Sequence, residues 1–266
     1  MGGSTHATLI VPAGGALEDR WFRRFALPSA KARLFCLPYA GGSAGIYRNW
    51  HDWMAPEVEV VAVELPGRGI HMRRAPLDRM EALTEALADA MRPLLDLPFA
   101  IFGHSMGGLV GFELSRALAR DHAAAPVHLF VSAIEPPHLF SSRMSLHDLP
   151  QGELIAALRG FNAAAAEAFQ NQELAEILLP VVRADFRLVE TYRYAAGAAL
   201  RHPITAFGGL ADASTPAHAL EAWREHTTES CMIRLLAGDH FFIHDYEHLL
   251  AASVARSLHR AGSPSP

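Results

Sequence analysis

The sequence predicts a doubly wound α/β domain, in which a mostly parallel sheet lies between layers of helices. Short, continuously apolar runs alternate with longer amphipathic ones from Arg33 onward. The apolar runs have the length and composition of strands that are buried on both faces of a parallel sheet. The chain has 266 residues, of which 50% are hydrophobic, so it is long enough for one large core with an insertion.

Six apolar runs are expected to form the strands of this sheet. In chain order they are 33–38, 58–64, 98–103, 127–133, 203–209 and 231–238. Amphipathic stretches between and after them predict helices at 46–54, 78–95, 106–120, 216–224 and 245–260. Such alternation of strands and helices favours parallel pairing through helical crossovers.

One interval, between the runs 127–133 and 203–209, holds about seventy residues and is too long for an ordinary crossover. Its apolar residues, among them Leu174, Ile177 and Leu178, recur at helical spacing. Pro180 is expected to kink this helix or to divide it in two. The interval is interpreted either as a helical extension packed on the domain or as a lid whose apolar surface lines a substrate pocket.

Composition and charge exclude several classes of partner. The net charge is −5, the charged fraction is 19%, and no long run of Lys or Arg offers a phosphate-binding surface, so nucleic acid is not expected as a partner. No apolar segment has the length that a membrane span requires, and the N-terminus lacks a signal-peptide pattern. We expect a cytoplasmic protein without membrane contact, and we expect residues 1–20 and the tail 261–266 to be disordered. Cys36 and Cys231 are interpreted as small buried thiols.

The stretch "PFAIFGHSMGGLVGFELSRALAR" carries the clearest chemical signal. A buried strand leads into Gly103-His104-Ser105-Met106-Gly107, and a helix follows. This is the Gly-x-Ser-x-Gly nucleophile elbow in the strand-turn-helix context that it requires. The two glycines leave room for the close approach of strand and helix, while the helix N-terminus directs N–H groups at the reacting oxygen. Ser105 is therefore the candidate nucleophile.

An attacking serine also needs donors for the oxyanion that forms on the substrate. One candidate is the backbone N–H of Met106, directly after the serine. The second is the N–H of Ala40 in "LFCLPYAGGSAG", a loop that resembles the glycine-bearing loop after the third strand of α/β-hydrolases. Tyr39 lies beside it as a possible substrate or lid contact. A flexible glycine turn remains the alternative for this loop.

The acid and the base are expected after the last two strands, in the chain order Ser, Asp or Glu, His. Asp212 follows the run 203–209, although it can also serve as a turn or helix-capping residue. Asp185 and Asp148, both in the inserted interval, are weaker candidates. His240 comes two residues after the last apolar run and is the candidate general base.

His240, His244 and His248 lie four residues apart, a spacing that can place metal ligands on one helix face. The first and third would be about 12 Å apart along a helix, too far to share one ion, so no metal site is expected. His104 adjoins the nucleophile but is interpreted as a packing residue.

These residues resemble the discrete type II thioesterases of polyketide and nonribosomal peptide biosynthesis, a family of the α/β-hydrolase superfamily. The matching segments span nearly the whole chain from Arg33 to His248; they are "LFCLPYAGGSAGIYRNW", "VVAVELPGRG", "FGHSMGGLVGFELSRAL", "LPVVRADFRLVETYRY", "FGGLADAST" and "AGDHFFI".

The resemblance implies an α/β-hydrolase core over 21–140 and 203–260 with a helical lid over 141–202. It implies Ser105 as nucleophile, His240 as base and Asp212 as the orienting acid. It further implies that the enzyme cleaves acyl thioesters on the phosphopantetheine arm of acyl or peptidyl carrier proteins. Such chemistry requires neither a metal nor an organic cofactor.

The resemblance leaves the roles of two residues open. Asp239 stands where the family often has glycine, and its carboxylate is either a neighbour that raises the pKa of His240 or a rival to Asp212. Arg68, in "ELPGRG", either contacts the lid or pantetheine or belongs to a structural turn. Two other functions stay open, a carboxylesterase or lipase that acts on free esters and a carrier-binding module without catalysis. The oligomeric state is not predicted.

Overall fold

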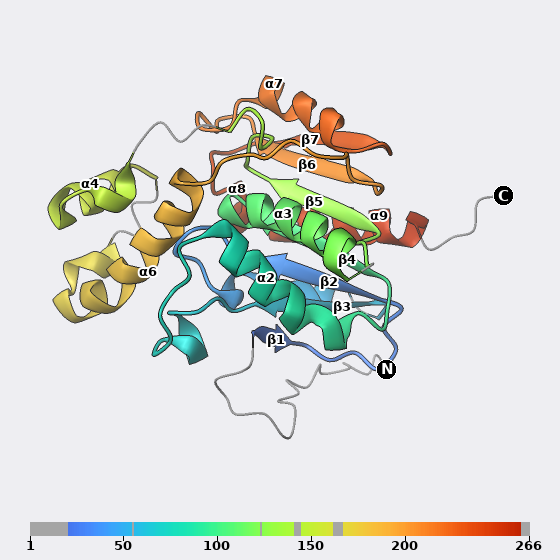
Figure 1. The fold of residues 1–266 in the computed structure, drawn as a ribbon, viewed down its shortest axis with the longest axis horizontal. Coiled ribbons are helices and arrows are strands. Elements are labelled where there is room, and N and C mark those ends of the chain that lie inside the picture. Colours follow the sequence, from blue (N-terminus) through green and yellow to red (C-terminus); the bar gives the residue numbers. More distant parts are fainter. Residues whose placement is uncertain (1–20, 55, 123, 141–144, 162–166, 262–266) are drawn as a thin grey trace.

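The computed structural model describes residues 21–54, 56–122, 124–140, 145–161 and 167–261. The described residues contain a seven-stranded sheet in the order β1-β3-β2-β4-β5-β6-β7 (Figure 1). Every neighbouring pair is parallel except β1 with β3. The predicted α/β class with a mostly parallel sheet is therefore confirmed. Of the segments expected to be disordered, residues 1–20 and 262–266 lie outside the described residues, whereas Ala261 belongs to the last helix.

The strands of the described residues are β1 (Phe22–Arg24), β2 (Ala32–Leu37), β3 (Val58–Val63), β4 (Phe99–His104), β5 (His128–Ser132), β6 (Ile204–Gly209) and β7 (Cys231–Leu236). All except β1 lie close to the apolar runs that predicted them. The sequence did not predict β1, because its three residues include two arginines and show no apolar run. It adds an antiparallel edge to the sheet through pairing with β3.

Burial on both faces was predicted for all six apolar runs, and this is wrong for β7. Met232 and Leu235 are 43% and 44% exposed, because β7 forms the edge of the sheet beyond β6. Cys231 at its start is only partly buried, whereas Cys36 in β2 is fully buried as expected.

The helices of the described residues are α1 (Trp50–Met54), α2 (Met80–Met91), α3 (Met106–Asp121), α4 (Gln151–Phe161), α6 (Gln172–Glu190), α7 (Ala217–Leu220), α8 (Phe242–Asp245) and α9 (Glu247–Ala261). Most of the predicted helices are shorter or more divided than expected, whereas α3 extends one residue beyond the predicted range 106–120. The expected helix 245–260 starts after a break at Tyr246, whose φ of −122° and ψ of 24° are not helical. Turns of 3-10 helix replace parts of the expected helices 46–54, 78–95 and 216–224. In the described ranges, no helix combines the length and hydropathy needed to cross a bilayer.

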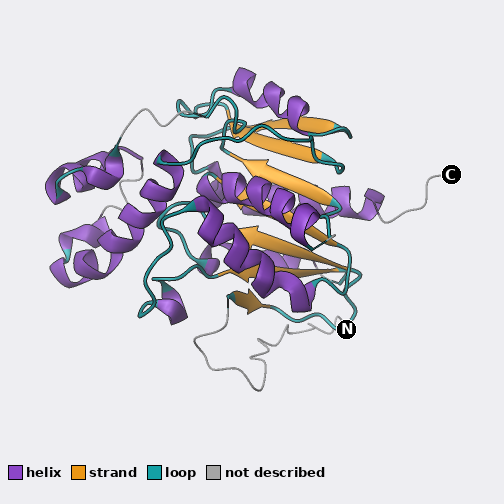
Figure 2. Ribbon diagram, in the orientation of Figure 1, coloured by secondary structure: helices purple, strands orange, loops and turns teal. Residues whose placement is uncertain are grey.

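Two layers of helices cover the sheet (Figure 2). Helices α2 and α3 pack on one face, where Leu83, Leu87, Leu109 and Leu114 belong to a core cluster that includes side chains of β2, β3, β4 and β5. Helices α1, α8 and α9 cover the other face, where a second cluster is formed; among its members are Trp50, Phe102, Phe207, Phe242, Leu250 and Val254. Burial of such side chains stabilises the fold by roughly 1.5–3 kcal/mol each.

Helices α4 and α6 lie beyond the carboxyl ends of the strands, at one side of the sheet (Figure 1). They share a small apolar cluster of their own, which contains Leu146, Leu154, Ala175 and Leu179. Of the two outcomes expected at Pro180, a kink or a division of the helix, the division is wrong, because α6 continues through the proline as one helix of 19 residues. Pro180 is exposed, so the carbonyl that loses its hydrogen bond to the proline lies on the solvent side of the helix.

Several histidines in the core are neutral because burial disfavours their charged form. Burial lowers the pKa of His128 to about 4, and nearby His202 contributes to the same effect. The His128 ring stacks on Phe130 at a centroid distance of 4.1 Å, and its Nε2 lies 2.9 Å from the Thr205 hydroxyl.

We expect His128→Gln to reduce the dependence of the unfolding free energy on pH between about 6.5 and 4. In this range the unfolded His128 binds a proton that the folded one excludes. The stability that neutral His128 contributes is present above pH 6.5, is lost as the pH falls, and amounts to on the order of 3 kcal/mol. Urea unfolding at several pH values measures the slope, and exposed His218, replaced by glutamine, is the control. An unchanged slope in His128→Gln would show that this imidazole is charged in the fold.

Candidate active site

Ser105 lies in a strained turn between β4 and α3, as the elbow motif predicts. Its φ of 52° and ψ of −120° fall in a region that non-glycine residues rarely adopt. Its backbone N–H donates to the carbonyl of Ser132 at the end of the neighbouring β5, at 2.7 Å. The turn places the serine side chain at the carboxyl edge of the sheet, where α3 begins.

Two glycines make this turn possible. A Cβ atom on Gly103 would lie 2.0 Å from the carbonyl oxygen of Gly107. A Cβ atom on Gly107 would lie 2.3 Å from the carbonyl oxygen of Leu37 in β2. Any side chain at either position would push the helix away from the strands. The packing therefore agrees with the expectation that the two glycines allow the close approach of strand and helix.

The structure brings Ser105, His240 and Asp212 into one chain of contacts. Nε2 of His240 lies 3.0 Å from Oγ of Ser105, and Nδ1 lies 2.9 Å from Oδ2 of Asp212. His240 comes from the loop after β7, and Asp212 from the loop after β6. Because carboxyl ends of parallel strands meet at one edge, residues 135 and 28 positions apart reach the same imidazole. The arrangement fits a serine whose proton is removed by His240.

Asp212 is buried and held by further donors. Its Oδ1 accepts the N–H groups of Ser214 at 2.9 Å and Thr215 at 3.2 Å, and the Ser214 hydroxyl at 2.6 Å. Burial acts to raise the pKa of Asp212, but the hydrogen bonds from His240 and Ser214 and the charge of His240 outweigh it, so the pKa is lowered. Asp212 thus caps its own turn and contacts His240 at once, which unites the two alternatives that the sequence left open.

Ser214 was not predicted from the sequence. Its hydroxyl lies 3.0 Å from Nδ1 of His240 and donates to Asp212, so it braces both partners. The available signal was the Asp-x-Ser-Thr spacing of "DAST", which is typical of a turn closed by an aspartate side chain.

The two candidate oxyanion donors lie beside Ser105, the candidate nucleophile. Met106 is the first residue of α3, so its N–H has no acceptor one turn back along the helix. The N–H of Ala40 likewise has no backbone or side-chain acceptor among the residues with described placement. Ala40, Met106 and Ser105 all line one cavity. Two unpaired N–H groups at a reacting serine form the arrangement that stabilises an oxyanion.

His104 contacts the loop that carries His240, the candidate base, in agreement with its interpretation as a packing residue. Its Nε2 lies 2.8 Å from the carbonyl oxygen of His240, and its Nδ1 lies 2.9 Å from the Ser132 hydroxyl. Burial, together with the nearby His240, lowers the pKa of His104 well below its usual value. A neutral ring in this position can donate to the carbonyl and accept from the serine.

The other two histidines of the spaced trio lie apart from this chain of contacts. His244, in α8, has its Nε2 3.0 Å from the Tyr39 hydroxyl, and His248, in α9, packs on Trp53 with ring centroids 5.5 Å apart. His240 precedes both helices, so the three do not share one helix face. In the part of the chain that the structure describes, no group of three or more His, Cys, Asp or Glu residues could hold a metal ion.

The competing acids lie elsewhere. Asp239 accepts the N–H of Phe241 at 2.8 Å through its own side chain. Asp148 lies on the surface with a side chain that is 76% exposed. Asp185 is buried and pairs with Arg68. Its Oδ2 accepts the backbone N–H of Gly41 at 2.7 Å. Arg68 therefore contacts the inserted helix α6, one of the alternatives left open for it.

A cavity of about 590 Å³ opens at Ser105, His240 and the two N–H groups. Its wall is mostly apolar, and the inserted region contributes part of it, including Leu146, Leu158, Leu178, Val181, Val182 and Phe186. An apolar chamber with a few polar groups at one end is typical of sites that bind a hydrophobic ligand next to a reacting centre.

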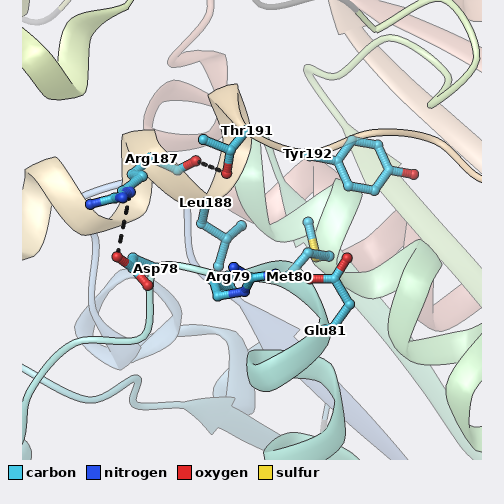
Figure 3. A pocket seen from close by; sticks show the side chains of 8 residues that line it. All are labelled: Asp78, Arg79, Met80, Glu81, Arg187, Leu188, Thr191 and Tyr192. Atoms are coloured by element: carbon cyan, nitrogen blue, oxygen red, sulfur yellow. Dashed lines mark hydrogen bonds and ion pairs between the residues drawn. The ribbon is translucent and has the colours of Figure 1, made fainter.

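A second cavity of about 300 Å³ lies between the start of α2 and the end of α6 (Figure 3). An ion pair crosses it, with Nε of Arg187 3.6 Å from Oδ2 of Asp78. It shares no lining residue with the cavity at Ser105. It holds no paired nucleophile and base, and we assign it no catalytic role.

Comparison with known proteins matches residues 32–261 of the chain to a family model described as "Thioesterase domain". The chain is 37% identical to the gramicidin S biosynthesis protein GrsT of Aneurinibacillus migulanus, over 92% of this chain and 96% of that protein.

Two solved structures are similar over most of their length. One is RedJ, a thioesterase from the prodiginine biosynthetic pathway of Streptomyces coelicolor, with a TM-score of 0.81, 37% identity, and 92% of this chain and 96% of that chain covered. The other is the type II thioesterase BorB from the borrelidin biosynthetic cluster, with a TM-score of 0.81, 32% identity, and 93% and 98% of the two chains covered.

Proposed function

Since this chain belongs to the thioesterase domain family and is a type II thioesterase, we propose that Ser105, His240 and Asp212 catalyse the hydrolysis of the thioester. The observation that carries the proposal is their chain of contacts at 3.0 and 2.9 Å, beside two unpaired N–H groups at the end of an apolar cavity. The substrates are acyl groups on the phosphopantetheine arms of acyl or peptidyl carrier proteins in polyketide or nonribosomal peptide synthesis. A cytoplasmic location stays a prediction from the sequence.

The first step forms an acyl-serine. His240 donates Nδ1–H to Asp212, which leaves the lone pair of Nε2 free to accept the proton of the Ser105 hydroxyl. The serine oxygen attacks the thioester carbonyl carbon, and the N–H groups of Ala40 and Met106 hold the oxyanion. When the C–S bond breaks, the pantetheine sulfur takes the proton from His240 and leaves as a thiol.

The second step restores the enzyme. His240 removes a proton from water, and the resulting hydroxide attacks the acyl-serine carbonyl. As the tetrahedral intermediate collapses, the proton on His240 returns to the serine oxygen and the free carboxylic acid departs. Every proton and electron pair is accounted for by Ser105, His240, substrate and water, so the proposed reaction uses no metal or organic cofactor.

We assign the apolar cavity to the acyl chain and the inserted helices α4 and α6 to a lid over it. The lid assignment is supported by the apolar side chains, among them Leu178 and Phe186, that this region contributes to the cavity wall. The buried charges in the same wall are paired, since Arg68 binds Asp185 and Glu190 accepts the backbone N–H groups of Leu146 and His147. An uncharged acyl chain therefore suits this chamber.

We expect the enzyme to hydrolyse carrier-bound butyryl and hexanoyl thioesters with a kcat/KM at least tenfold above that for p-nitrophenyl esters of the same acids. The carrier arm contributes contacts that free esters lack, and those contacts are used in the transition state. Intact-protein mass spectrometry follows loss of the acyl group from the carrier. Preference for free esters would favour the carboxylesterase alternative. Tight carrier binding without turnover would favour a binding module.

A further inference from the structure

Arg68 and Asp185 form a buried ion pair between the core and the inserted helix α6. Their side chains are 6% and 2% exposed. Nη2 of Arg68 donates to Oδ1 of Asp185 at 2.7 Å, and Nη1 donates to Oδ2 at 2.8 Å. The fork of the guanidinium thus meets the carboxylate at two points, a geometry that lysine cannot reproduce.

Both members of the pair also hold the backbone of the oxyanion loop, which we define as residues 39–42. Oδ2 of Asp185 accepts the N–H of Gly41 at 2.7 Å. Nη1 of Arg68 donates to the carbonyl of Gly42 at 3.0 Å. The two glycines are therefore both held by one ion pair, whose members lie 144 and 26 positions away in the chain.

The oxyanion loop is a tight turn whose shape fixes the direction of the Ala40 N–H. The N–H of Gly42 donates to the carbonyl of Tyr39 at 2.9 Å, and Gly41 has a φ of 76°, as in a type II turn. In a trans peptide the C=O and N–H point in opposite directions. Because the carbonyl of Tyr39 points into the turn, the N–H of Ala40 in the same peptide points out of it.

We propose that Arg68 and Asp185 are positioning residues that keep the Ala40 N–H aimed at the oxyanion, so that catalysis depends on the seating of α6. The inference rests on the proposed role of Ala40 as a donor. Gly41 carries the peptide next to Ala40, and its positive φ is strained for any other residue. Without the pair, the turn loses the two bonds that hold it from outside.

Helix α6 is fitted to this loop by shape as well as by charge. A Cβ atom on Gly41 would lie 3.2 Å from Cγ2 of Val182, and one on Gly67 would lie 3.0 Å from Cγ2 of Val181. Val181, Val182 and Asp185 therefore face the core together from successive turns of α6. The same helix contributes Leu178 and Phe186 to the cavity wall, so the element that encloses the acyl chain also holds the oxyanion loop.

The pair is not built for stability alone. Burial of two charges is costly, and Nε of Arg68 is buried without a partner among the residues with assigned positions. Apolar replacements of a buried ion pair are often as stable as the pair itself. An apolar replacement of the pair can therefore keep the stability of the fold while it loses the hydrogen bonds to the oxyanion loop. A loss of kcat in such a variant indicates a positioning role and not a purely structural one.

The test compares four variants by steady-state kinetics on butyryl-carrier protein. We expect Asp185→Asn and Arg68→Lys to reduce kcat by about 10–100-fold with KM changed less than about threefold, because a displaced donor weakens the transition state rather than the ground state. The double variant R68M/D185L is expected to retain thermal stability but to keep the low kcat. Arg187→Gln breaks an exposed ion pair from α6 to Asp78 that does not touch the oxyanion loop, and its kcat should equal wild type.

A second readout uses an acyl trifluoromethyl ketone, which forms a tetrahedral adduct with the serine. Its inhibition constant should rise in parallel with the loss of kcat/KM across the variants, while butyryl-carrier affinity in a Ser105→Ala background stays unchanged. Wild-type kcat in Asp185→Asn or in a folded R68M/D185L would overturn the inference. If Ser105→Ala itself remained active, the proposed function would fail instead, so the two failures are distinguishable.

Discussion

Replacing Ser105 by alanine is expected to reduce kcat for hydrolysis of a carrier-bound acyl group by at least about 10⁴-fold. The substitution removes the Ser105 hydroxyl oxygen, which lies 3.0 Å from Nε2 of His240. Without this oxygen the acyl-serine intermediate cannot form. The Cβ atom is retained, so the turn at φ 52° has the same backbone strain in both proteins. Single-turnover mass spectrometry of the acyl-carrier substrate measures the loss.

Ser115→Ala is the matched control for this variant. Ser115 is a buried serine of α3 whose hydroxyl donates to the carbonyl of Gly111 at 2.8 Å, within its own helix. Its kcat should equal that of wild type, and both variants should unfold at similar temperatures. Activity that persisted in a folded Ser105→Ala variant would remove Ser105 from the mechanism.

Asp212→Asn is expected to lower kcat by about 10³–10⁴-fold while leaving the fold intact. Three donors, from Ser214 and Thr215, converge on Oδ1, so the amide oxygen of asparagine will occupy that position. The NH₂ group then faces His240 and donates to Nδ1. This fixes the imidazole in the tautomer with a proton on Nε2, which cannot accept the proton of Ser105.

Asp239→Asn is the matched control for the acid. Its carboxylate accepts the N–H of Phe241 instead of a hydrogen bond from the His240 ring, so kcat and the pH–rate profile should match wild type. Comparable losses in the two variants would contradict the assignment of Asp212. A shifted profile in Asp239→Asn alone would show that its charge tunes the base.

The roles of residues that belong to a local sequence motif could be predicted from the sequence. The strand-turn-helix context of Ser105 depends on glycines within two residues, and those glycines now account for the close contacts of β4, α3 and β2. Asp212 and His240 could be predicted from the order of the strands, because the carboxyl ends of the strands in a parallel sheet lie at one edge. Ser214 was overlooked, since its role appears only when Asp212 and His240 meet.

Contacts across long intervals could not be predicted. Arg68 and Asp185 are separated by 117 residues, and no local pattern links a turn after β3 to a helix in the insertion. The same reason explains the errors in the fold. Exposure of β7 depends on its place at the sheet edge, and the path of α6 through Pro180 depends on which side of the helix faces water.

The central claim is that hydrolysis proceeds through an ester on Ser105. Wild-type enzyme mixed with butyryl-carrier protein, quenched within one turnover and digested, is examined by peptide mass spectrometry. The account predicts a single butyryl group on Ser105, in the peptide that joins β4 to α3, and its decay as free butyrate appears. A butyryl group that forms and decays on another residue at the rate of turnover would contradict the account.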